Sequence, residues 1–196
     1  MTQAASPVAR SLLRAALACL LAMGTGAALA DDYADVNALL RAGKATEALD
    51  KADRYIAGNP RDPQMRFLRG VILSEQGKTT DATDTFVKLT QDYPELPEPY
   101  NNLAVIYAAR GDLDKARDTL LTALRLNPNY AVAHENLGDV YVRLAARQYN
   151  RAQSYASISA SVAPKLAMIR QLVDRTGESS NGALPADSPE QRRLVR

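Results

Sequence analysis

This chain of 196 residues has few of the side chains that carry enzymatic or metal chemistry. It contains one cysteine, Cys19, one histidine, His134, and no tryptophan. A single cysteine excludes an internal disulfide and a cysteine-pair metal or redox motif. His134 begins the run His-Glu-Asn-Leu-Gly, which lacks the second histidine of a zinc-protease helix. Gly-x-Ser-x-Gly and phosphate-binding glycine motifs are missing as well, so we expect no enzyme activity, no metal and no cofactor.

The charge of the chain is nearly balanced. It has 24 Lys and Arg against 22 Asp and Glu, and the segment 1–30 holds two of these bases, Arg10 and Arg14, and no acid. Removing two of 24 bases leaves 22 of each sign in 31–196. Because nucleic-acid binding requires a basic face, we expect no nucleic-acid partner. Charge divides along the chain, with 13 bases and 16 acids in 31–128 and 9 bases and 6 acids in 129–196.

The segment 1–30 has the organisation of a secretory signal peptide. Arg10 and Arg14 precede an uncharged stretch that ends in Ala28-Leu29-Ala30, a small-x-small cleavage site. The apolar part has about sixteen residues, fewer than the roughly 20 that a membrane-crossing helix needs. We therefore expect a cleavable signal, export to the periplasm and no stable membrane insertion after cleavage. A mitochondrial transit peptide and a lipoprotein anchored at Cys19 are the alternatives.

An interval of 34 residues recurs through the centre of the chain. Such a fixed period is the sequence signature of a repeat architecture. It relates Gly43, Gly77 and Gly111, then Ala48, Ala82 and Ala116, and also Pro60, Pro94 and Pro128. Between these markers apolar residues recur every three or four positions and never alternate, which predicts helices and no strands. Each glycine ends one helix and each proline ends the next. The predicted helices are 32–42 and 45–58, 63–76 and 79–92, and 97–110 and 113–126.

The unit resembles the tetratricopeptide repeat when each proline is given position 32. Position 8 of that repeat, normally Gly or Ala, holds Gly70, Ala104 and Gly138, and the first unit departs with Val36. Position 11, normally large, holds Leu39, Leu73, Tyr107 and Tyr141, and position 20 holds the three alanines named above. The resemblance implies an all-α, right-handed α-solenoid whose small residues let paired helices approach closely. It also implies a protein or peptide partner, bound on a concave groove.

The resemblance covers residues 31–164 as four units, 31–60, 63–96, 97–130 and 131–164. In the fourth unit no glycine marks the turn, and Pro164 comes two positions later than the interval would place it. This spacing predicts a two-residue extension around 145–148, with helices near 131–146 and 149–162. Residues 165–175, with Leu166, Ile169 and Val173 on one face, are predicted to cap the array. The polar segment 176–196 is expected to be a disordered tail.

The resemblance also predicts which residues contact a partner, because in this family the first helix of each unit lines the groove. The predicted contact residues are Asn37, Arg41, Phe67, Val71, Ser74, Asn101, Asn102, Val105, Glu135, Asn136, Asp139 and Arg143. Asn102 and Asn136 share one repeat position, where an amide can donate to and accept from a peptide backbone. Asparagine can equally be tolerated there as an exposed side chain. The cations with which some family members hold a C-terminal carboxylate are missing.

These features predict an adaptor or accessory chaperone that binds an envelope protein. The alternative is a structural assembly subunit that forms a homo-oligomer through its repeats. The position of exposed apolar residues distinguishes the two. Apolar side chains exposed in the groove, such as Phe67, Val71 or Val105, favour a bound partner, whereas exposed apolar residues on the outer helices or the capping helix favour self-assembly.

The N-terminal segment generates a first testable prediction. Cleavage after Ala30 should yield a periplasmic chain that begins at Asp31, and the intact mass of protein recovered from the periplasm measures this. A mature chain that begins at an acylated Cys19 would contradict the prediction and identify a lipoprotein.

Overall fold

The computed structural model describes residues 32–155 and 159–179. The predicted signal peptide, Cys19 and the chain from residue 180 onward lie outside these ranges. Within them every regular element is an α-helix, as the sequence predicts. None of the described helices is both long and apolar enough to cross a membrane.

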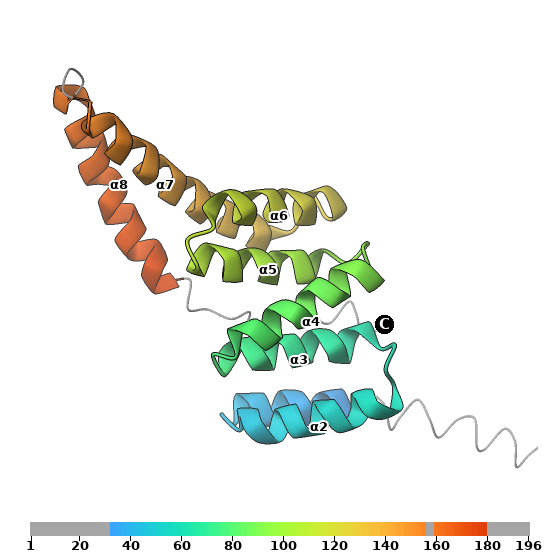
Figure 1. Cartoon of the computed structure of the whole chain (residues 1–196). Helices are drawn as coiled ribbons and strands as arrows, with labels where there is room; N and C mark the ends of the chain where they lie inside the picture. Colours follow the sequence, from blue (N-terminus) through green and yellow to red (C-terminus); the bar gives the residue numbers. More distant parts are fainter. Residues whose placement is uncertain (1–31, 156–158, 180–196) are drawn as a thin grey trace, which may run out of the picture.

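The helices pair into hairpins that stack one after another (Figure 1). The first hairpin consists of the helix at 32–41 and α2 (Ala45–Gly58). The second consists of α3 (Pro63–Glu75) and α4 (Thr79–Asp92), and the third of α5 (Pro97–Ala109) and α6 (Leu113–Leu126). We call the first helix of each pair the A helix and the second the B helix. Helices pack mainly on their neighbours in sequence, which gives an all-α solenoid, and the predicted helices up to residue 126 are confirmed.

The turn inside each hairpin depends on a glycine with positive φ. Gly43, Gly77 and Gly111 have φ of 71°, 70° and 86°, a conformation that residues with a side chain rarely adopt. At the second turn the Gly77 N–H donates to the Ser74 carbonyl at 3.0 Å, and the Lys78 N–H donates to the Leu73 carbonyl at 2.9 Å. The other two turns repeat this pattern, which is that of a Schellman helix end. The regular interval between the glycines therefore reflects a repeated backbone requirement.

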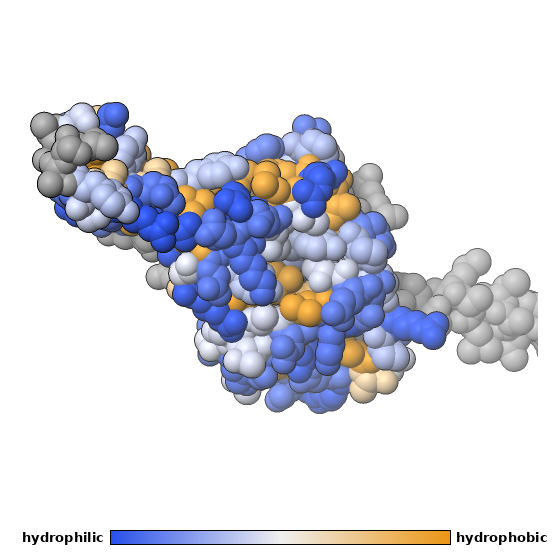
Figure 2. All heavy atoms as spheres, turned by 45° about the horizontal axis from the view of Figure 1, so that its top comes forward, coloured by the Kyte–Doolittle hydropathy of each residue, from blue (hydrophilic) through white to orange (hydrophobic). Residues whose placement is uncertain are grey.

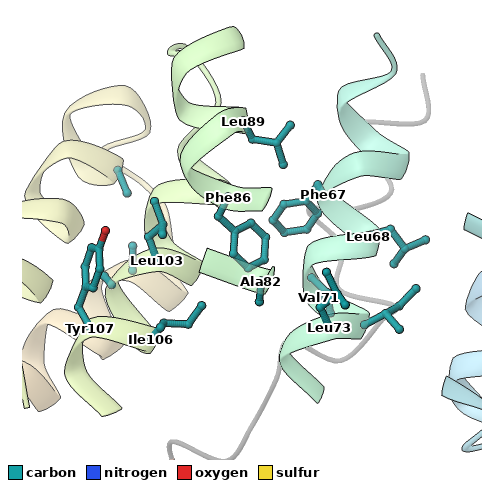
Figure 3. Packing of buried hydrophobic residues seen from close by; sticks show 14 of the residues in the cluster. Phe67, Leu68, Val71, Leu73, Ala82, Phe86, Leu89, Leu103, Ile106 and Tyr107 are labelled. Carbon is teal, nitrogen blue, oxygen red and sulfur yellow. The ribbon is translucent and has the colours of Figure 1, made fainter. Parts of the chain in front are cut away.

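Small residues bring the two helices of a hairpin together. Ala48, Ala82 and Ala116 on the B helices are fully buried, and Gly70 and Ala104 are buried on the A helices. At Gly70 an added Cβ would lie only 2.6 Å from Cε1 of Phe86. The Phe86 ring in turn packs against Phe67, with ring centroids 5.7 Å apart (Figure 3). The glycine thus makes room for the aromatic pair at the centre of the second hairpin.

Asp62 joins the first hairpin to the second. Its Oδ1 accepts hydrogen bonds from the Gln64 and Met65 N–H groups at 3.0 and 3.1 Å, which caps the beginning of α3. Its Oδ2 accepts from the hydroxyls of Tyr33 at 2.5 Å and Tyr55 at 2.9 Å. One carboxylate therefore binds groups from the helix at 32–41, from α2 and from α3.

The fourth unit differs from the predicted helix–turn–helix. α7 (Ala131–Gln153) runs without interruption, so the predicted turn around 145–148 is wrong. The sequence from 143 to 153 contains neither glycine nor proline, so nothing in it ends the helix. α7 has 23 residues whereas α3 and α5 have 13 each. Its second half projects beyond the array together with α8 (Figures 1 and 2).

A single helix, α8 (Ser159–Ser179), replaces the predicted helix at 149–162 and the predicted capping helix at 165–175. Pro164 lies inside α8 near its beginning, where the missing N–H removes one intrahelical bond without ending the helix. Leu166 is buried, and α8 packs on α7 instead of covering the seam of the last repeat. Tyr141 in that seam is accordingly 48% exposed, whereas its repeat equivalent Tyr107 is buried. Helix at 176–179 also contradicts the predicted disorder there.

Two glycines at the same repeat position yield opposite predictions. Gly70→Ala should destabilise the protein by about 1–3 kcal/mol, because the new methyl overlaps the buried Phe86 ring. Gly138→Ala should instead stabilise it by about 0.5–1 kcal/mol, because nothing lies within 4 Å and alanine favours the helix. Urea unfolding of both variants measures the two signs. Equal effects would show that Gly70 and Gly138 do not occupy different environments.

Candidate functional site

The A helices form a face of the array that we call the A-helix face, made by residues 32–41, α3, α5 and α7. A pocket of about 170 Å³ opens on it between the beginnings of α3 and α5. Since water occupies about 30 Å³ per molecule in the liquid, one side chain of a partner can enter this space. The surface of the pocket is mostly apolar. It is lined by Asp62, Pro63, Gln64, Phe67, Leu96, Glu98 and Pro99.

Three of the predicted contact residues are almost fully buried. Phe67, Val71 and Asn101 are only 7%, 6% and 2% exposed. Phe67 and Val71 belong to the hydrophobic core, because the B helix α4 brings Phe86 against the same helix face. Val71 and Asn101 are therefore packed within the array, and their contact with a partner stays a prediction. Phe67 remains accessible only as a wall of the pocket.

The amides predicted to bind a peptide backbone already have internal partners. Asn136 Nδ2 donates to Asn101 Oδ1 at 2.8 Å, which links α7 to α5 through a buried side chain. Asn102 Nδ2 donates to the Glu98 carbonyl of its own helix at 3.0 Å. An amide has two N–H donors and one carbonyl acceptor, so one such bond leaves capacity for a ligand. Asn136 nevertheless helps to hold two helices together, which the sequence did not predict.

Three acidic side chains lie near the pocket and on α7 in the A-helix face. Glu98 lines the pocket, and Glu135 and Asp139 follow on α7 one turn apart. Burial raises the pKa of the Asp139 carboxyl, and repulsion from Glu135 raises it further, while Arg143 opposes both effects. A cationic group of a partner would therefore be attracted to this end of the face.

The remaining predicted residues have different degrees of exposure. Arg41, Ser74 and Glu135 are exposed, and Val105 is half-buried. Asn37 is also half-buried, and its Oδ1 has no hydrogen-bond partner within the described residues. Arg143 lines a separate cleft beside α8 together with Leu113. The structure therefore divides the predicted set between core, face and cleft.

Most of the residues that line the pocket were not among the predicted contact residues. Gln64 and Glu98 both occupy position 2 of their repeats, which is one of the partner-contact positions of the resembled family, so a signal for them was present. Pro63, Leu96 and Pro99 carried no such signal, because the pocket forms only where two successive units meet.

Stacked helical hairpins that share one continuous face define a helical repeat protein, whose binding surface is open and extended. A TPR repeat model matches residues 106–144, and a tetratricopeptide repeat model matches residues 33–97. The chain belongs to the tetratricopeptide repeat family. Both matching models describe repeats, and neither describes a catalytic domain.

Solved structures of the same fold resemble the chain. YrrB, a TPR protein with an unusual peptide-binding site, is 25% identical with a TM-score of 0.50, over 53% of this chain and 54% of YrrB. The match thus spans about half of YrrB. The first TPR of Spaghetti (RPAP3), bound to the HSP90 peptide SRMEEVD, is 20% identical with a TM-score of 0.54, over 58% of this chain and 90% of that one. MamA is 19% identical with a TM-score of 0.51, over 76% and 87%. No curated protein matches the sequence.

The raised pKa of Asp139 makes stability depend on pH in a defined direction. A carboxyl whose pKa is raised by folding destabilises the folded state above that pKa, and the effect disappears below the ordinary value of 3.8. Asp139→Asn should therefore raise the melting temperature at neutral pH and have no such advantage at about pH 3. Thermal unfolding followed by circular dichroism measures both, with Asp84→Asn on the B helix α4 as a control. A variant no more stable than wild type at neutral pH would show that attraction to Arg143 outweighs burial.

Proposed function

We propose that this chain is a non-catalytic interaction module that holds a segment of a partner protein on the A-helix face. The observation that carries the proposal is the apolar pocket between α3 and α5. It offers a site for one apolar side chain of the partner, at a junction of two repeats that is fixed by packing on both sides. Apolar pockets with a few polar groups at the rim are the usual form of binding sites.

Polar groups beside the pocket suit the backbone of such a segment. Asn102 lies one helical turn beyond Glu98 at the pocket rim, and its amide can both accept from and donate to a peptide backbone. The likeness to YrrB, which has a peptide-binding site, supports the same kind of ligand. Glu98, Glu135 and Asp139 favour a neutral or basic segment over an acidic one.

The N-terminal sequence supports a proposal for where this module acts. With a cleavable signal over residues 1–30, we propose an adaptor or accessory chaperone that acts on an envelope protein in the periplasm. Such a role needs no catalytic group and fits the near-neutral charge of residues 31–196.

Self-assembly is a second candidate, favoured by where the exposed apolar residues lie. Met168 and Leu172 on α8 are 68% and 44% exposed, and Leu126 at the end of the B helix α6 is exposed as well. The predicted groove residues Phe67 and Val71 are buried instead. A homo-oligomer through α8 would cover the two α8 side chains.

Blocking the pocket should weaken partner binding without unfolding the chain. Gln64→Trp places a large ring at the half-buried pocket rim, and Asn102→Ala removes an amide hydrogen bond of about 0.5–1.5 kcal/mol. The double variant should bind a partner captured by crosslinking in the native periplasm at least about tenfold more weakly, a difference of about 1.4 kcal/mol. Calorimetric titration measures the affinity.

The matched control is Lys88→Ala on the exposed side of α4. Equal affinity of the double variant and wild type would exclude the A-helix face as the binding site. Sedimentation of a dimer that Met168→Ser and Leu172→Ser abolish would then support self-assembly.

A further inference from the structure

The extension of α7 creates a second concave surface outside the A-helix face. An open cleft of about 620 Å³ lies where α7 passes the beginning of α6 and faces α8. Leu113 from α6, Ala146 from α7 and Val173 from α8 give it a mainly apolar surface. Its lining on α7 runs from Arg143 to Arg151, which at 1.5 Å per residue is about 12 Å, or roughly two helical turns, and Ser154 follows at the end of the helix.

A row of cations follows one edge of this cleft. Arg143, Arg147 and Arg151 recur every four residues, so they lie on one side of α7 about 6 Å apart. Among the described residues that line the cleft, none is acidic. A continuous row of one sign beside an apolar surface is complementary to an acidic amphipathic ligand.

Among the described residues, Arg147 is the one of these three arginines that forms a salt bridge. Arg147 pairs with Asp114 at 2.7 Å, and Asp114 is shared with Arg117. Within the described residues neither Arg143 nor Arg151 forms a salt bridge. Asp139, one turn before Arg143, interacts with it electrostatically without an ion pair. Asp114 likewise attracts Arg151 without an ion pair. Arg170 of α8 donates to Asn150 at 3.2 Å and adds a further cation nearby.

We propose that this cleft binds an acidic amphipathic helix of a partner protein. Carboxylates four residues apart on such a helix repeat at the same spacing as the arginines, since both are set by the rise of an α-helix. Apolar residues one position before each carboxylate would face Leu113, Ala146 and Val173. This site goes beyond the proposed function, because it lies on another surface and selects the opposite charge.

The ends of the same chain do not have the required chemistry. Residues 180–196 contain Arg192, Arg193 and Arg196 against two acids, Asp187 and Glu190, so they are basic overall. The segment 1–30 contains no acid. The charge of the cleft therefore points to another protein as the source of the acidic helix.

Binding of a synthetic peptide tests the proposal. A labelled peptide of Glu-Ala-Ala-Leu repeats places Glu and Leu on adjacent lines of one helix, and its twin of Lys-Ala-Ala-Leu repeats reverses the charge. In fluorescence anisotropy the full chain should bind the Glu peptide and not the Lys peptide. Arg143→Gln with Arg151→Gln should raise the Kd about tenfold, since two exposed charge pairs are lost. Arg147 is left unchanged because it pairs with Asp114.

Three further variants make the test specific. Arg54→Gln with Arg125→Gln removes the same charge from exposed positions on α2 and α6 outside the cleft and should leave the Kd unchanged. Arg143→Glu with Arg151→Glu should reverse the preference toward the Lys peptide. Gln64→Trp should leave the Kd for the Glu peptide unchanged. Failure of the proposed cleft site is therefore distinguishable from failure of the proposed pocket site.

Three results would overturn the proposal. The first is equal binding of the Glu and Lys peptides, or a Gln double variant that binds as wild type does. The second is binding to phosphatidylserine vesicles, lost in the Gln double variant, with no binding of the Glu peptide, which would assign the cleft to membranes. The third is a sedimenting dimer abolished by the same variant, again without peptide binding, which would assign it to a second copy of this chain.

Discussion

The close approach of the two helices in each hairpin is the constraint on which the rest of the array depends. It requires small residues on both sides, and the buried Ala48, Ala82 and Ala116 supply one of them. Gly70 supplies the other in the second hairpin, where Phe86 fills the space left by a missing side chain. Once the pair is close, the ring of Phe86 reaches the core and contacts Phe67. Stacking of the next hairpin follows from this packing, because no hairpin buries its apolar face alone.

The end of the array shows what happens where this constraint is not met. Gly138 occupies the same repeat position as Gly70, yet within the described residues nothing lies within 4 Å of an added Cβ. α8 lies instead against the extended part of α7, and Tyr141 stays exposed as a result. The pocket and the cleft arise from these two situations, one between regular units and one where the regular pattern stops.

Local backbone signals made the regular part of the fold predictable from sequence. Gly43, Gly77 and Gly111 have positive φ, and a glycine in the sequence is by itself a signal for such a turn. The hairpin turns were therefore located correctly. The fourth unit was mispredicted because the period was extended to a segment without a turn glycine, and because Pro164 was interpreted as a helix end. In α8 that proline is accommodated within the helix.

The sequence predicted which side of the array carries the candidate site, but not which residues are accessible there. Repeat positions indicate which side of a helix faces outward, but burial depends on what another helix contributes. Val71 was predicted as a contact and is buried in the core. Asn136 and Asn101 belong to different repeats, and nothing in the local sequence predicts their hydrogen bond. The pocket likewise requires the joint shape of two units.

Contacts between neighbouring helices also determine how the molecule gains and loses order. Each hairpin closes over a short loop, so contact order is low and ordering can begin at any unit. Opening is correspondingly local, because a terminal unit has a neighbour on one side only. The pocket lies between inner units, whereas the cleft belongs to the terminal one. A ligand in the cleft would therefore be coupled to the fraying of the array's end, and a ligand in the pocket would not.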